Sequence, residues 1–140
     1  MDEILNQVKK LTGKILNKDF KPLDELDIPK RQGIYIIKEK TSRFFNNKNK
    51  LFYIGKSTNL FNRIIRQHIS TSDNVAGSIL RKKLHKKGLP YNEIRKYLKE
   101  ECLFITQDIE DFDITALVED LLIAILRKQG EPLINNIKEK

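Results

Sequence analysis

The sequence predicts a single domain of mixed α/β class, in which a small sheet is covered by helices. Two short apolar, β-branched runs, at residues 32–39 and 51–55, are typical of strands. The segments before and after them repeat their apolar residues with helical spacing. At 140 residues the chain has the length of one domain and can bury a core.

The first half of the chain should form a helix followed by a hairpin. Apolar residues from 4 to 16 have helical spacing, interrupted by Gly13, and residues 20–31 carry two prolines that favour a loop or short turn. The two strands are separated by residues 40–50, which are rich in turn-forming asparagine. We therefore expect the strands to pair.

The second half should hold two or three helices, one more strand and a last helix. Capping and turn residues mark their ends. In chain order we expect a helix after Ser57, Thr58 or Asn59, a basic helix at 76–88 ended by Gly88, a helix opened by Pro90, a buried strand at 102–106, and a helix that starts at Asp111 or Asp113 and ends at Gly130.

The composition excludes several classes of protein. No run of 18 apolar residues is present, so no membrane-spanning helix is expected, and the N-terminus lacks the apolar core of a signal peptide. The single Cys102 excludes an intramolecular disulfide and fits a reducing, cytoplasmic compartment. One cysteine with His68 and His85 is too little for a structural zinc site.

The charge is distributed unevenly along the chain. The net charge is +8, and residues 56–100 hold 11 basic and 3 acidic side chains, whereas residues 101–140 hold 4 basic and 9 acidic ones. A basic middle segment indicates a positive face for a polyanion such as nucleic acid. The alternative is that the lysines only keep the chain in solution.

Glu119 stands within the apolar run of the last predicted helix. A buried carboxylate must be paired or bind a metal ion. The alternative is that Glu119 shares a narrow solvent-facing stripe with Thr115. Taken singly, Lys56, Arg63 and His68 also fit ordinary exposed residues.

The order of the polar residues along the chain is more specific than any one of them. They are Gly33-Ile34-Tyr35, Tyr53-Ile54-Gly55, Arg63, His68, Glu119 in a late helix, and Asn135 after Pro132. In this order they resemble the GIY-YIG nuclease superfamily, which includes homing endonucleases, repair excinucleases and some restriction enzymes. The resemblance makes residues 32–140 the catalytic domain and residues 1–31 a helical extension packed on it.

This resemblance implies an α+β fold with a small, three-stranded, mostly antiparallel sheet flanked by helices. It also implies a metal-dependent endonuclease that hydrolyses phosphodiester bonds in DNA, RNA not being excluded, with one Mg²⁺ or Mn²⁺ ion. A catalytically weak or inactive nucleic-acid-binding or assembly module on the same fold stays open as the alternative.

The resemblance also implies roles for single residues. Glu119 would be the metal ligand, and Arg63 would donate to the phosphoryl oxygens. Tyr35 would be the candidate general base, and Lys56 or the metal could lower its high pKa.

The other residues would assist these three. Tyr53 and His68 would position the water and the phosphate or relay the proton, and Asn135 would order the site. If the two strands pair, the tyrosine hydroxyls should approach each other and face the residues that bind metal and phosphate.

His68 departs from the family pattern. In many members the histidine, or a tyrosine in its place, lies four residues after the arginine, a position that Gln67 occupies here. One residue along an α-helix is a rotation of about 100°. Either the helix is locally irregular, or His68 is used from another angle, or Gln67 fills the position.

Several basic residues are candidates for binding nucleic acid. Phosphate contacts position a protein without specifying sequence, so we expect a weak or structure-dependent DNA preference that falls steeply with salt. The N-terminal helix could pack on the domain, bind a protein partner or form a homo-oligomer. The candidate phosphate contacts are Lys56, Arg66, Arg81, Lys82, Lys83, Lys86 and Lys87.

Overall fold

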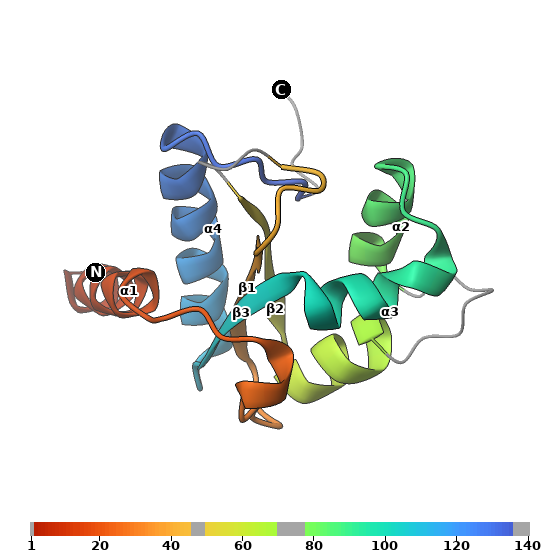
Figure 1. Cartoon of the computed structure of the whole chain (residues 1–140). Coiled ribbons are helices and arrows are strands. Elements are labelled where there is room, and N and C mark those ends of the chain that lie inside the picture. The colour runs from red at the N-terminus through yellow and green to blue at the C-terminus, as the bar shows by residue number, and fades with distance from the viewer. Residues whose placement is uncertain (1, 46–49, 70–77, 136–140) are drawn as a thin grey trace.

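A three-stranded sheet lies between two layers of helices in the computed structural model, which describes residues 2–45, 50–69 and 78–135 (Figure 1). This arrangement confirms the predicted α+β class. Helices α1 and α4 cover one face of the sheet, and η2, α2 and α3 cover the other (Figure 1). The helices are α1 (Asp2–Leu16), the 3₁₀ turn η1 (Leu23–Glu25), the π-helix η2 (Asn62–Ile69), α2 (Ile79–Lys86), α3 (Tyr91–Glu100) and α4 (Phe112–Lys128).

The central strand is β1 (Gly33–Glu39), which pairs antiparallel with β2 (Leu51–Ser57) and with β3 (Cys102–Asp108). The predicted hairpin is confirmed. The register of β1 and β2 shifts after Ile37, where Phe52 is the extra residue of a β-bulge. Because of this bulge, Phe52 and the residue after it both face the layer of η2, α2 and α3.

Side chains of β1 alternate between the two layers, as a strand requires. Ile34 and Ile36 pack with α1 and α4, whereas Tyr35 and Ile37 pack with η2, α2 and α3. The tyrosine of the first sequence block therefore points into the layer from which His68 comes.

Helix ends fall at the predicted capping residues. The side chain of Asn59 accepts a hydrogen bond from the backbone of Asn62 at 3.0 Å, and Asp111 accepts one from the backbone of Ile114 at the start of α4, also at 3.0 Å. Pro90 precedes α3. The basic helix begins at residue 79, and residues 76–77 of the predicted span lie outside the described part of the chain.

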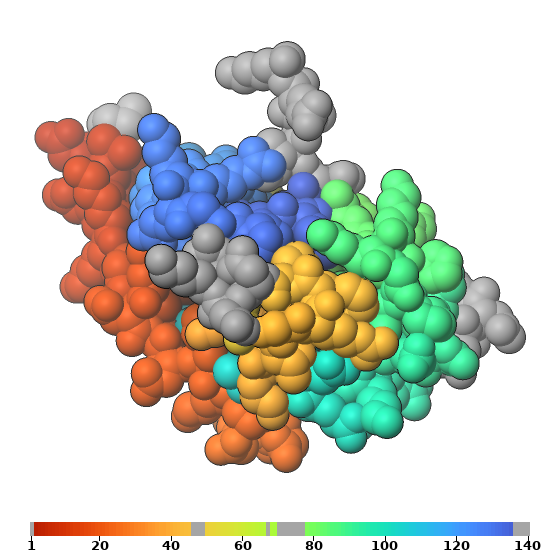
Figure 2. Space-filling model, turned by 45° about the horizontal axis from the view of Figure 1, so that its top comes forward, coloured from red at the N-terminus to blue at the C-terminus, as the bar shows by residue number. Residues whose placement is uncertain are grey.

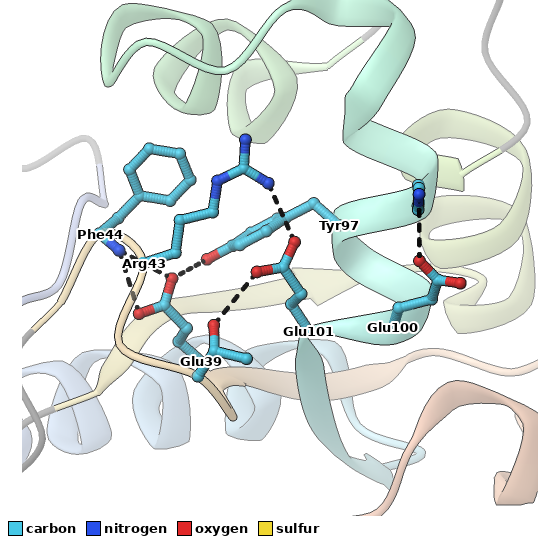
Figure 3. A network of polar contacts seen from close by, with 8 residues as sticks. Glu39, Arg43, Phe44, Tyr97, Glu100 and Glu101 are labelled. Atoms are coloured by element: carbon cyan, nitrogen blue, oxygen red, sulfur yellow. Dashed lines mark hydrogen bonds and ion pairs between the residues drawn. The ribbon is translucent and has the colours of Figure 1, made fainter.

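A buried carboxylate closes the far end of β1. Glu39 is fully buried and accepts hydrogen bonds from the backbone N–H groups of Phe44 (3.1 Å) and Phe45 (3.0 Å) and from the hydroxyl of Tyr97 (2.7 Å). Figure 3 shows this carboxylate enclosed by its donors. The segment after β1 is thereby fixed against α3.

The same segment lies between the two helical layers at the surface. Figure 2 shows it in yellow-orange, between α4 with the C-terminal segment in blue and α2 in green. Within the described residues, no helix is long and apolar enough to cross a bilayer.

Candidate active site

Tyr35 is the residue around which the site is built. A Cβ atom placed on Gly55 would lie 2.2 Å from Cζ and 2.3 Å from the hydroxyl oxygen of Tyr35. The tyrosine of the first sequence block therefore lies across the glycine of the second, and any side chain at position 55 would displace it. Tyr53 lies beside it, with ring centroids 6.0 Å apart.

His68 is the second partner of this tyrosine. Its Nε2 atom lies 2.7 Å from the Tyr35 hydroxyl, and its Nδ1 atom lies 2.8 Å from Oγ of Ser78. Ser78 also caps α2 by accepting a hydrogen bond from the backbone of Arg81. A hydrogen-bonded chain therefore leads from the tyrosine through the histidine to the start of α2.

The π-helix explains how His68 reaches the site from five residues after Arg63. In an α-helix these two residues would lie about 140° apart. The i→i+5 hydrogen bonds of η2 bring them to the same side, where Arg63 influences the titration of His68. The helix is thus locally irregular, the first of the three alternatives; the side chain of Gln67 lies outside the described residues.

Burial decides the protonation of the central pair. It lowers the pKa of His68 to about 3, and the neighbouring cations Arg63 and Arg81 act in the same direction. Burial also raises the pKa of Tyr35 well above its ordinary value, as does the neighbouring Tyr53. The cation that opposes this rise in the pKa of Tyr35 is Arg63, not Lys56 as the resemblance predicts.

Glu119 reaches the same place from the opposite layer. Its half-buried carboxylate lies near Lys56 of the edge strand β2. Burial raises the pKa of Glu119, and the nearby charges of Lys56 and Arg63 oppose this rise. Thr115 is only 3% exposed, so the alternative of a solvent-facing stripe shared by Glu119 and Thr115 is wrong.

Arg63 completes the site with a group that the fold does not satisfy. Its Nε atom is buried and has no hydrogen-bond partner among the described residues. Arg63 and Lys56 line a cavity of about 180 Å³ together with Ser57, Thr58 and Thr115. A buried guanidinium N–H without a partner is unfavourable, and the oxygen of an anion would satisfy it.

Asn135 contacts the strand rather than the cavity. Its side-chain amide accepts a hydrogen bond from the backbone N–H of Ile54 at 2.9 Å and donates one to the carbonyl of the same residue. Next to it, the backbone N–H of Ile134 donates to the carbonyl of Phe52 at 2.7 Å. Asn135 therefore fixes the middle residue of the second block, between Tyr53 and Gly55.

The oxygen donors fit a hard cation held by few protein ligands. In the part of the chain that the structure describes, no three side chains of His, Cys, Asp or Glu come together. Glu119 offers a single carboxylate next to two phenol groups, which does not suit zinc. It suits Mg²⁺ or Mn²⁺, which bind through one or two carboxylates and keep several waters.

The predicted phosphate contact at Arg81 is wrong, because this side chain is only 1% exposed. Its guanidinium donates to the carbonyl of His68 at 3.0 Å and to that of Tyr91 at 3.3 Å. It therefore ties η2, α2 and α3 together. The other candidates lie at the surface or near it: Arg66, Lys82, Lys86 and Lys87 are exposed and Lys56 and Lys83 are half-buried.

Ser78 was missed by the sequence analysis. A serine at the start of the basic segment is a typical helix-capping residue, and this could have marked Ser78 in the sequence. Nothing in the sequence linked it to His68. The link is a tertiary contact between a residue of η2 and the residue that caps α2.

Comparison with known proteins agrees with the geometry. A family model described as the GIY-YIG catalytic domain matches residues 31–117. The match includes both tyrosine blocks, Arg63 and His68, and it ends before Glu119 and Asn135. No curated protein and no solved structure matches the chain. Since the family model spans more than half of the sequence, the chain belongs to the GIY-YIG family.

Proposed function

We propose that this protein is a metal-dependent endonuclease that hydrolyses phosphodiester bonds in DNA. The observation that supports this best is the unsatisfied Nε atom of Arg63 beside Tyr35 and Glu119. Arg63 can bind a phosphate, Tyr35 can bind a water molecule, and Glu119 can bind a cation.

Arg63 binds the phosphate in this proposal. Its guanidinium donates to the non-bridging oxygens, where negative charge gathers in the transition state. Lys56 lies in the same cavity and adds a second positive charge. The Nε atom of Arg63, which has no partner among the described residues, would gain one when substrate binds. The guanidinium is already in place without substrate, so binding needs little rearrangement of this side chain.

Glu119 would hold the metal ion. When bound, the ion would supply Lewis-acid stabilisation of the phosphate and the leaving oxygen. The positive charges of Lys56 and Arg63 near this carboxylate favour its ionised form. A cation at this point also offsets the burial that makes ionisation of Glu119 unfavourable.

Tyr35 and His68 move the proton. The attacking water gives its proton to the Tyr35 oxygen while the tyrosine passes its own proton to Nε2 of His68, 2.7 Å away. This route avoids a free tyrosinate, which burial disfavours. Phosphate bound at Arg63 neutralises a cation that lowers the pKa of His68, so substrate binding makes the histidine a better proton acceptor.

The test is the nicking of supercoiled plasmid with Mg²⁺ or Mn²⁺. We expect Glu119→Ala and Arg63→Ala to lower the rate at least about 1000-fold. Asp113→Ala is the matched control, because this acidic residue is exposed in the first turn of the same helix, and it should cleave like the wild type.

The proposal fails if the wild type cleaves DNA and RNA no faster than Glu119→Ala. Retained DNA binding by both inactive variants in that case would support the alternative of a nucleic-acid-binding module. A gel-shift assay on the same samples distinguishes the two.

A further inference from the structure

Phe112 is exposed at the entrance of the cavity that Arg63 lines. It is the first residue of α4, and with 57% exposure it is the most exposed large apolar side chain among the described residues. Neither of the two core clusters found among the described residues includes Phe112. A single exposed apolar side chain is ordinary on a protein surface. What distinguishes this ring is its position, because it lines the cavity that Lys56 and Arg63 also line.

Two cations lie on the cavity side of the ring, whereas the residues that flank Phe112 in the sequence, Asp111 and Asp113, are acidic and exposed. The ammonium group of Lys56 lies over it, 5.6 Å from the ring centroid, and Lys56 and Arg63 line the same cavity. An apolar protein partner would have to bury both cations, which is costly. A nucleotide instead offers a flat base to the ring and a phosphate to the cations.

The cavity continues along the surface. Gln32 and Thr58 line both it and a neighbouring cavity of about 310 Å³, which extends to Arg31. Asp108 and Glu110 also line this second cavity, and Arg31 is paired there with Asp108 at 3.8 Å. The cations that can bind a phosphate beside Phe112 are therefore Arg63 and Lys56 of the first cavity.

We propose that Phe112 stacks on an unpaired nucleobase next to the scissile phosphate, so that the enzyme acts where a nucleotide has left the duplex. The inference rests on the proposed nuclease function and specifies its substrate class. Inside a duplex both faces of a base are covered by its neighbours, so a ring can stack only on a base in a single strand, an overhang, a bulge or a flipped position. Stacking depends on the aromatic face rather than on the base, which gives selectivity for structure without selectivity for sequence.

The test measures binding in the Glu119→Ala background, where the substrate stays intact. Two labelled DNA probes are compared: a fully paired duplex, and the same duplex with one unpaired nucleotide that carries 2-aminopurine. We expect Phe112→Leu to weaken binding of the second probe about tenfold and to abolish the fluorescence quenching of its base. Its affinity for the paired duplex should change less than twofold.

Three controls separate stacking from other effects. Phe112→Trp keeps an aromatic face and should retain both the affinity and the quenching. Leu117→Ala removes an exposed apolar residue of the same helix and should behave like the parent. Phe112→Leu should leave the salt dependence of binding unchanged, whereas Lys56→Ala should reduce its slope by about one.

Equal loss of affinity for both probes, or no loss for either, would overturn the stacking proposal. So would a parent protein that binds both probes equally or neither. If the stacking signature is present but the wild type cleaves nothing, the nuclease function fails and the binding site stands. Because the ring lies outside the described cores, we expect each variant to fold. Thermal unfolding curves check this.

Discussion

Glu39 and Glu119 both lie close to buried tyrosines, and the fold treats them in opposite ways. Glu39 accepts hydrogen bonds from two backbone N–H groups and from Tyr97, and no part of it reaches solvent. Glu119 is half-buried, and Lys56 and Arg63 are the cations near its carboxylate. The first carboxylate is enclosed by its donors (Figure 3), whereas the second faces Arg63, Tyr35 and Tyr53.

The difference separates a structural carboxylate from a functional one. A buried polar group whose hydrogen bonds are all made within the fold stabilises the fold. One with few partners destabilises it, and a bound ligand can supply the missing interactions. Substitutions at the two positions should therefore change the free energy of unfolding in opposite directions.

The largest effect on stability is expected for Glu39→Gln. Phe45 and Tyr97 donate to different oxygens of the carboxylate. The amide would turn one of these acceptors into a donor and remove the negative charge from the other, so the free energy of unfolding should fall by about 3 kcal/mol in urea titrations. Cleavage per folded molecule should not change. Glu101→Gln is the control, because it loses only the partly exposed pair with Arg43, which should cost less than about 1 kcal/mol. A Glu39→Gln protein as stable as this control would contradict the structural role.

The next effect is a dependence of stability on pH that comes from His68. Its pKa is about 3 in the folded protein against about 6.5 in the unfolded chain. Below pH 6.5 the unfolded chain therefore binds a proton that the folded protein does not, and stability is lost at about 1.4 kcal/mol per pH unit.

Urea titrations at pH 7 and pH 5 measure this contribution. The stability difference between wild type and His68→Gln should shrink by about 2 kcal/mol on going to pH 5. An unchanged difference would show that His68 titrates normally and is not held neutral by burial.

A smaller loss is expected for Asn135→Ala. It leaves the N–H and C=O groups of Ile54 without their side-chain partner, at the edge of the sheet where water can replace it in part. The free energy of unfolding should fall by about 1.5 kcal/mol. Asn135→Asp keeps the acceptor and loses only the donor, so its loss should be intermediate. Equal stability of all three proteins would remove Asn135 from the support of the strand.

The smallest effect, with the opposite sign, is expected for Glu119→Gln. Burial raises the pKa of Glu119, so the ionised carboxylate opposes folding at pH 7, and the neutral amide should stabilise the protein by up to about 1 kcal/mol. As the pH falls through this raised pKa, the wild-type carboxyl becomes neutral and the gain should disappear. A loss of stability at pH 7 would instead place Glu119 in the same class as Glu39.

Much of the fold followed from local patterns in the sequence. The strands, the hairpin and the caps at Asn59 and Asp111 depend on neighbouring residues, and these were predicted. The neighbourhood of the two tyrosines follows once strands β1 and β2 pair, because the register brings their residues together. The approach of Arg63 and Glu119 was expected only from the resemblance to the GIY-YIG family, because these residues come from η2 and α4.

Two features depend on tertiary contacts that the sequence does not display. The hydrogen bonds of η2 shift to the π pattern where His68 meets Tyr35, two residues that are 33 positions apart. Arg81 shares a helix face with Leu80 and Leu84, and its burial could have been suspected from this position. The positive charge of Arg81 instead favoured the prediction of an exposed residue. The carbonyl groups that satisfy its guanidinium come from η2 and α3, and the sequence does not show that they lie nearby.

The π-helix also bears on how related sites can be found in sequences. An i→i+5 turn holds one residue more than an α-turn, so a helix can gain or lose a residue by changing its hydrogen bonds while its two ends stay in place. The number of residues between an arginine and its histidine is then free to vary in evolution while their separation in space stays the same. A search pattern with a fixed gap would reject this chain, whereas one that allows a single-residue insertion after the arginine would retain it.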